Sequence, residues 1–133
     1  MALRIAERAL RAIIEHARDA APSECCGLLL GGGDEIVEAV RARNIAAEPT
    51  RFLIDPKDHI DARRDARRRG LEVVGFYHSH PHTRADPSET DRALAAYSDH
   101  LYLIVSLVSD PPEISLVRLE DGNFRALSFV RVP

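Results

Sequence analysis

The sequence predicts a single α/β domain over residues 1–133, in which a mixed or largely antiparallel sheet is flanked by helices. The chain is long enough to bury a core of its own and short for two domains. Apolar runs of strand length recur between turn signals, and segments with helical spacing of apolar residues lie between them. The resulting order is strand, helix, strands, helix, strand, helix, strands.

The first half of the chain is divided by proline and glycine signals. Pro22 ends an amphipathic helix. The glycine-rich turn at 31–34 separates two apolar runs, which predicts a hairpin. Asp55 and Pro56 supply an N-cap and a first-turn proline for a second helix, which stops at Gly70. The expected elements are a strand at 3–5, a helix at 6–20, strands at 25–30, 35–42 and 52–54, and a helix from 55 to about 69.

The second half begins with a buried strand that ends at Pro81, because proline has no N–H for the ladder. Ser88 opens a helical run in which Leu94 and Tyr97 are spaced three apart. An Asp-Pro-Pro turn and an Asp-Gly-Asn turn separate the remaining apolar runs. The expected elements are a strand at 71–80, a helix opening at Ser88, and strands at 101–108, 114–119 and 124–132.

Composition and charge are those of an ordinary globular protein, with 45% hydrophobic residues, 29% charged residues and a net charge of −3. This mildly acidic balance gives no electrostatic basis for binding nucleic acid or an anionic membrane. No stretch approaches the ~20 apolar residues needed to span a bilayer. Charged residues interrupt the N-terminal apolar positions, so no signal-peptide core is expected. We expect a cytoplasmic protein.

The two cysteines, Cys25 and Cys26, are adjacent in an expected strand. Neighbouring strand residues point to opposite faces, so a disulfide between them would need severe distortion. No Cys-x-x-Cys pair is present, which removes the usual structural-zinc and redox motifs. We expect reduced thiols that fill apolar space. The alternative is that one thiol lines the site and makes it sensitive to oxidation.

Arginines crowd the end of the second expected helix. Cations are favourable near a helix C-terminus, and aspartates are intercalated among them, which favours a solvated charged face. The alternative is a contact patch for an acidic protein partner. The residues concerned are Arg63, Arg64, Arg67, Arg68 and Arg69, with Asp58, Asp61 and Asp65 between or before them.

One short window gathers side chains that can bind a metal. His78 and His80 are two apart on an expected strand, so both point to one face while Ser79 points away. Asp91 lies in the first turn of an expected helix, where the dipole favours negative charge. A histidine pair at a strand end and an aspartate at a helix start can converge on one ion. Ser88 and Asp91 also have the spacing of a capping box, which is a purely structural interpretation.

This window resembles the signature of the JAMM/MPN zinc peptidases, also called JAB domains: His-x-His-Pro, six residues, Ser, two residues and Asp. Residues 78–81 with Ser88 and Asp91 match it without a gap. The segment 22–31 looks like the one that carries the family's catalytic glutamate, which would be Glu24. The resemblance covers nearly the whole chain and favours the small stand-alone bacterial type. It implies an MPN-type domain with a curved sheet, related in architecture to cytidine deaminases.

A catalytic zinc ion takes three protein ligands and leaves one position to water. The expected ligands are His78, His80 and Asp91. By the resemblance, Glu24 would carry a proton from the attacking water, activated by zinc, to the leaving amine. Ser88 would donate a hydrogen bond to the developing oxyanion.

The other histidines receive no metal role. A fourth protein ligand would close the site to water, so His82 is expected to be a loop residue. Tyr77 and Ser79 point away from the histidine face and are expected to pack or to support the ligands. Metal-like spacing is absent for His16, His59 and His100.

The expected reaction is zinc-dependent hydrolysis of an amide or isopeptide bond. Family members typically cut after the C-terminal glycines of ubiquitin-like proteins, and the bacterial members that this chain resembles act on ubiquitin-like sulfur-carrier proteins. The resemblance therefore implies such a protein, with a C-terminal Gly-Gly, as substrate and partner. The chain lacks the long insertions of eukaryotic deubiquitinating relatives, which disfavours a ubiquitin-specific role.

Two other functions are considered. Some family members have lost their ligands and serve as scaffolds, but Glu24 and the three expected ligands are intact here. A zinc deaminase of related architecture would need His-x-Glu followed by Pro-Cys-x-x-Cys, and neither motif is present. The oligomeric state is not predicted.

Overall fold

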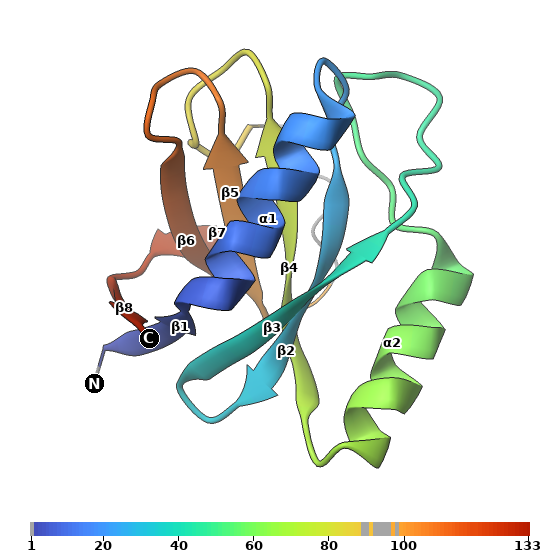
Figure 1. Cartoon of the computed structure of the whole chain (residues 1–133), viewed down its shortest axis with the longest axis vertical. Helices are drawn as coiled ribbons and strands as arrows, with labels where there is room; N and C mark the ends of the chain where they lie inside the picture. The colour runs from blue at the N-terminus through green and yellow to red at the C-terminus, as the bar shows by residue number, and fades with distance from the viewer. Residues whose placement is uncertain (1, 89–90, 92–96, 98) are drawn as a thin grey trace.

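The computed structural model describes residues 2–88, 91, 97 and 99–133. Among these residues, eight strands form one curled sheet, and a helix packs against each of its faces (Figure 1). The elements are β1 (Leu3–Ala6), α1 (Glu7–Ala20), β2 (Cys26–Gly32), β3 (Glu35–Ala42), α2 (Pro56–Arg68), β4 (Glu72–His80), β5 (Leu101–Ser106), β6 (Glu113–Glu120), β7 (Asn123–Ala126) and β8 (Phe129–Val132).

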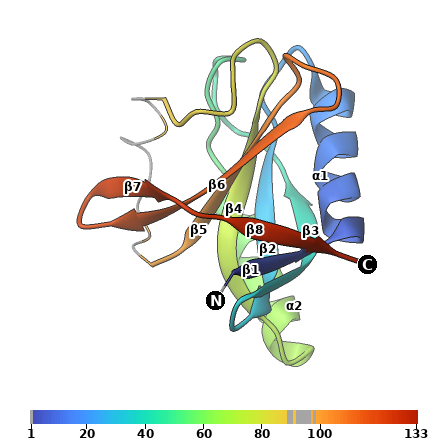
Figure 2. The same cartoon turned by 90° about the vertical axis from the view of Figure 1, so that its left-hand side faces the viewer.

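The strand order is β7-β6-β5-β4-β2-β3-β1-β8, which places β4 and β2 at the centre. β4 pairs in parallel with β5, and β1 pairs in parallel with both β3 and β8, whereas the other neighbours are antiparallel. The mixed sheet flanked by helices that the sequence predicts is therefore confirmed. Figure 2 shows the curl, with the hairpin of β6 and β7 projecting away from α1.

Alternation along the central strands builds two separate cores. On β2, Leu29 packs in the cluster that includes α1, whereas Leu28 packs in the cluster that includes α2. On β4, Tyr77 belongs to the α1 cluster and Phe76 to the α2 cluster. Each central strand therefore contributes side chains to both sides of the sheet.

The adjacent cysteines follow the same alternation. Cys25 belongs to the α1 cluster and Cys26 to the α2 cluster, and both are buried and free. Burial raises the pKa of Cys25 to about 11 and that of Cys26 to about 12, so both thiols stay protonated near neutral pH. This agrees with the prediction that they are reduced, apolar fillers.

α1 covers its face of the sheet with a continuous apolar stripe. The buried side chains recur at three- and four-residue intervals, which is the spacing of one helix face. They are Ala9, Leu10, Ile13 and Ala17.

α2 covers the opposite face more thinly. The carboxylate of Asp55 accepts a hydrogen bond from the N–H of Lys57, which is the N-cap that the sequence predicts. The helix is followed by Gly70 with φ +72°, a conformation that glycine adopts without strain. Its buried side chains are the small Ala62 and Ala66. A helix that buries only alanines fills little space, so room remains on this face.

Two expected strands differ from the structure. Residues 52–54 were expected as a strand, but the segment makes only an isolated bridge between Asn44 and Ile54. The N–H of Leu53 is bound instead by the side chain of Asn44, and the carbonyl of Leu53 accepts the N–H of Ile45.

The expected strand at 124–132 is two strands. β7 pairs with β6, but β8 pairs with β1 at the opposite edge of the sheet. Leu127 and Ser128, between the two strands, are not part of either one. Apolar residues continue through the break, and a sequence pattern does not reveal which distant strand is the partner. Of the helix expected to open at Ser88, Leu94 lies outside the described residues.

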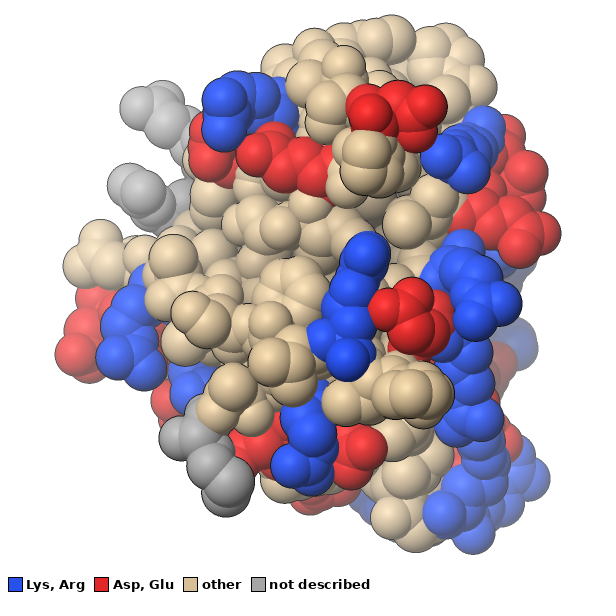
Figure 3. Space-filling model, turned by 60° about the vertical axis from the view of Figure 1, so that its left-hand side comes forward, with Lys and Arg blue, Asp and Glu red and all other residues tan. Residues whose placement is uncertain are grey.

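The described surface carries charges of both signs. Figure 3 shows Lys and Arg interspersed with Asp and Glu, with uncharged residues between them. At the arginine-rich end of α2, Arg69 pairs with Glu38 and Asp65, and Arg68 also pairs with Asp65. Among the described residues, neither the length nor the apolar content that a membrane-spanning helix requires is found together in any helix.

Candidate metal centre

β4 brings two imidazoles together at its C-terminal end. The Nε2 atoms of His78 and His80 lie 3.2 Å apart, and the two residues are 2% and 4% exposed. The intervening side chain of Ser79 lies on the other face, where its Oγ accepts the N–H of Cys25. The prediction that the histidines share one face is confirmed.

Asp91 completes the cluster from a segment beyond the strand. Its Oδ1 lies 3.1 Å from Nε2 of His78, and its Oδ2 lies 3.0 Å from Nε2 of His80. The N–H of Ser88 donates to Oδ2, and the N–H of Asp91 donates to Oγ of Ser88, so the expected capping box is present. Burial alone would raise the pKa of Asp91, but the hydrogen bonds with both imidazoles and with Ser88 outweigh burial and hold that pKa well below its usual range.

The loop after β4 fixes the orientation of His80. Its Nδ1 lies 2.8 Å from the carbonyl of Arg84, which can only accept, so Nδ1 is the donor and Nε2 faces the cluster. The loop itself is held by Ser106, which donates to the carbonyl of Thr83, and by Glu113, which accepts the N–H of Ala85. Burial lowers the pKa of His80, but its bonds to Asp91 and Arg84 outweigh burial and leave that pKa raised.

His78 is oriented by packing. The ring of Phe52 stacks on its imidazole, with centroids 4.3 Å apart and planes 18° from parallel. Burial lowers the pKa of His78, so the neutral form that can bind a metal is favoured at neutral pH.

Glu24 lies two residues before β2, the strand that pairs with β4. The antiparallel register pairs Cys26 with His78, which places Glu24 level with His80. Burial raises the pKa of Glu24 to about 7, while the charge of His80 lowers it and that of Asp91 raises it. Its Oε1 is buried and has no hydrogen-bond partner among the described residues. An orphaned carboxylate oxygen of this kind is typical of a functional position.

The cluster fits a divalent metal ion. Ligand atoms of His78, His80 and Asp91 all lie within 4.8 Å of one another, and all three residues are buried. Two facing Nε2 atoms and a carboxylate form the nitrogen and oxygen donor set that zinc accepts. His82 is exposed and lies outside this group, in agreement with its expected place in a loop.

An apolar pocket of about 270 Å³ adjoins the cluster. Its wall includes His78 and Asp91, so a group bound in the pocket would sit next to a metal held by them. The remaining lining is mainly aromatic and aliphatic, and among the described residues it includes Phe52, Phe76 and Tyr102. Such a pocket is the usual form of a site for part of a substrate.

Two supporting residues could not be predicted from the sequence. Phe52 stacks on His78, and Asn44 donates a hydrogen bond to the carbonyl of Glu24. Both contacts join residues that are distant in the chain, so no local periodicity could reveal them. A single asparagine after a predicted strand was the only available signal, and it is equally typical of an ordinary turn.

The fold and the donor set together define an α/β protein with a two-histidine, one-carboxylate cluster of the type found in zinc hydrolases. The particular family follows from sequence. The chain belongs to the family described as prokaryotic homologs of the JAB domain, whose model matches residues 6–120. The chain is 38% identical to a desampylase of Haloferax volcanii, over 78% of this chain and 80% of that protein. It is 34% identical to a CysO-cysteine peptidase of Mycobacterium tuberculosis, over 85% of this chain and 80% of the peptidase.

Solved structures support the same fold. A solution structure of a protein from Desulfitobacterium hafniense matches with a TM-score of 0.89 and 30% identity, covering 98% of this chain and 92% of that one. The crystal structure of a JAB1/MPN domain protein from Archaeoglobus fulgidus matches with a TM-score of 0.67, covering 99% of this chain and 98% of that one. At 22% identity the second match shows the fold alone. The chain is therefore an MPN-like α/β domain.

Proposed function

We propose that this protein is a zinc-dependent hydrolase that cleaves an amide or isopeptide bond at the C-terminus of a ubiquitin-like or sulfur-carrier protein. His78, His80 and Asp91 would hold the zinc ion, with Glu24 and Ser88 as catalytic residues. The observation that carries the proposal is the buried convergence of the three ligand side chains, within 4.8 Å, in a member of the JAB family.

The chemistry divides between the metal and the chain. A bound zinc ion supplies a Lewis acid and lowers the pKa of water toward neutrality. Glu24 has a pKa of about 7, so near neutral pH it can take a proton from water and pass it to a leaving amine. Oγ of Ser88 accepts the N–H of Asp91, which leaves its own proton available for the carbonyl oxygen of the substrate.

Two observations support the substrate class. The relatives of this chain include proteins named desampylase and CysO-cysteine peptidase, and the matches cover most of each protein. The pocket beside His78 and Asp91 would accept an extended C-terminal tail next to the metal.

The test measures zinc content and amide cleavage together. The probes are a peptide ending in Gly-Gly joined to aminomethylcoumarin, and ubiquitin joined in the same way. We expect about one zinc per chain and metal-dependent release of the coumarin, with zinc and activity both lost in His78→Ala because two ligands hold zinc weakly. Glu15→Gln, on the exposed side of α1, serves as a folded control that retains the metal.

Three results would contradict the proposal. Less than about one zinc per two chains in carefully purified protein would favour a non-catalytic scaffold. Full zinc without cleavage of either probe would remove the peptidase assignment. Release of ammonia from free nucleosides, with both amide probes intact, would indicate a deaminase.

A further inference from the structure

Within the loop between β3 and α2, residues 44–54 are organised by one side chain. Oδ1 of Asn44 accepts the N–H groups of Ala46 and Leu53, at 3.0 and 2.9 Å. Its Nδ2 donates to the carbonyls of Arg51 and Glu24, at 3.0 and 3.1 Å. Both donor hydrogens and both acceptor lone pairs of this amide are thus used, which is the full capacity of an asparagine side chain.

The first pair of contacts reaches Glu24. Nδ2 of Asn44 binds its carbonyl, and the carbonyl of Pro49, in the same loop, accepts its N–H. Glu24 lies outside the regular ladder of β2, which begins at Cys26. The loop therefore supplies the backbone partners that the sheet does not provide at this position.

The second pair of contacts reaches the metal side of the site. Asn44 binds the carbonyl of Arg51 and the N–H of Leu53, the residues on either side of Phe52. Phe52 is thereby fixed where its ring stacks on His78. One amide group thus contacts the backbone of Glu24 and brackets the residue that packs on a metal-binding imidazole.

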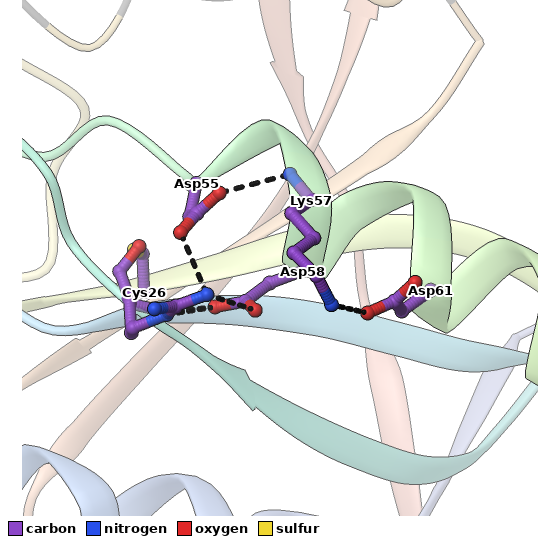
Figure 4. Close-up of polar contacts among 6 residues, drawn as sticks. Cys26, Asp55, Lys57, Asp58 and Asp61 are labelled. Atoms are coloured by element: carbon purple, nitrogen blue, oxygen red, sulfur yellow. Dashed lines mark hydrogen bonds and ion pairs between the residues drawn. The ribbon is translucent and has the colours of Figure 1, made fainter.

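The base of the loop is closed independently of Asn44. The N–H of Asp55 donates to the carbonyl of Arg43, and the Arg43 guanidinium pairs with Asp55 and Asp58 (Figure 4). The same carbonyl also lies 3.8 Å from Sγ of Cys26, which can donate weakly to it. Because the ends are held by these contacts, loss of the Asn44 amide would loosen the interior of the loop without opening its base.

We propose that Asn44 is a positioning residue that sets the place of Glu24 and of Phe52 relative to the metal ligands. This inference rests on the proposed function. Displacing a catalytic group by about 1 Å can cost on the order of a hundredfold in rate, so a residue that fixes the Glu24 backbone acts on turnover without touching substrate.

Two substitutions separate the hydrogen bonds that Asn44 donates from those that it accepts. Asn44→Asp keeps an acceptor for the N–H groups of Ala46 and Leu53 but has no N–H for the carbonyls of Glu24 and Arg51, so the loop stays bound at Leu53, next to Phe52, while Glu24 loses its side-chain partner. Asn44→Ala removes both the donated and the accepted bonds. We expect Asn44→Asp to lower kcat on the order of tenfold to a hundredfold, with KM changed less than about threefold and zinc affinity retained. Asn44→Ala should weaken zinc binding as well, by roughly tenfold or more, because partners of metal ligands contribute on that scale.

A double-mutant cycle tests whether Asn44 acts through Glu24. With the coumarin peptide as probe, Asn44→Asp should lower kcat in the native background but have little further effect in Glu24→Gln, since the group it positions is then gone. Asn123→Asp is the matched control, because Asn123 is exposed at the start of β7. It should change neither kcat nor zinc affinity. All rates are taken per zinc-loaded folded molecule at low temperature, so that lost stability does not imitate lost turnover.

The outcomes separate this inference from the function on which it rests. Zinc-loaded native protein with no activity would remove the proposed function. An active native protein in which Asn44→Asp lowers only the unfolding temperature, or lowers kcat equally in both backgrounds, would show a structural role and overturn the inference. If Asn44→Asp does not fold, zinc affinity and kcat of Asn44→Ser, which retains one donor and one acceptor, decide the question in the same cycle.

Discussion

The two faces of the sheet are built from the same strands, but one face forms a packed core and the other carries the candidate site. Under α1 the packing is continuous: Ile13 and Leu29 are fully buried, and the hydroxyl of Tyr77 has a partner in His16 at 2.7 Å. Under α2 the helix buries only alanines, and Pro56 and His59 at its start line the pocket beside the histidine cluster. Alternation along β4 lets one strand support a stable core and a reactive site at once.

The difference also appears in how polar groups are satisfied. On the α1 side, the hydroxyl of Ser79 is bound to the N–H of Cys25. On the site side, Oε1 of Glu24 is buried without a partner among the described residues, and two imidazole nitrogens face each other at 3.2 Å. An arrangement of this kind costs stability unless a ligand or metal relieves it. We therefore expect substitutions on the site side to change activity more than stability, and substitutions on the α1 side to do the opposite.

The largest expected effect is on catalysis. Glu24→Gln removes the proposed proton carrier but keeps the shape of the side chain, so turnover of the coumarin peptide should fall on the order of a hundredfold to ten-thousandfold. Zinc content should stay unchanged, because Glu24 is not an expected ligand. Glu15→Gln, on the exposed side of α1, is the control. Undiminished turnover in Glu24→Gln would remove Glu24 from the mechanism.

The next effect is on stability and tests the α1 side. Ile13→Ala opens a cavity under α1, where Ile13 is fully buried, and should lower the free energy of unfolding by about 3 kcal/mol. Ile60→Ala, on α2, removes the same atoms from a residue that is 52% exposed and should cost far less. Denaturant unfolding of the two variants measures the contrast. Equal losses would mean that the two helices do not differ as described.

A smaller effect is expected within β4 itself. Tyr77→Phe removes the hydroxyl that contacts Nδ1 of His16 and should cost about 1 kcal/mol of stability. Tyr77 is adjacent to His78 in sequence but faces α1, so zinc affinity and kcat should stay within twofold of the native values. A large loss of zinc in Tyr77→Phe would show that the two faces are coupled through the strand.

The last prediction concerns the dependence of stability on pH in the metal-free protein. Burial raises the pKa of Glu24 from 4.5 to about 7, so between these values the folded protein holds a proton that the unfolded chain releases. The contribution of Glu24 to stability is therefore present below pH 4.5 and is lost as pH rises toward 7. Glu24→Gln should unfold at a higher temperature than the native protein at pH 8, with the gap closing at pH 4. A gap independent of pH would contradict the raised pKa.

Local signals in the sequence were sufficient for the elements that bring the site together. The spacing of His78 and His80 fixes a shared face once a strand is accepted, and Pro81 marks its end. Ser88 and Asp91 carry their capping pattern within four residues, and the structure contains it. These predictions succeeded because each depends on atoms close together in the chain.

The predictions that failed concern contacts between distant segments. β8 leaves the hairpin of β6 and β7 to pair with β1 at the far edge, and no pattern within 124–132 identifies that partner. Residues 52–54 have the apolar composition of a strand, but the Asn44 side chain binds the N–H of Leu53, which a neighbouring strand would otherwise have bound. The place of Glu24 was obtained from a family resemblance and not from its own surroundings.

The parallel pairing of β4 with β5 has a topological consequence. Antiparallel neighbours can be joined by two residues, but parallel neighbours require the chain to travel back along the sheet before it starts again. β4 ends at His80 and β5 begins at Leu101, and Asp91 belongs to the connection between these two strands. The third side chain of the cluster, Asp91, thus lies in a long connection that the parallel direction of β5 requires. If β5 were antiparallel to β4, a tight turn could follow His80, and the connection would not carry an aspartate to the histidine pair.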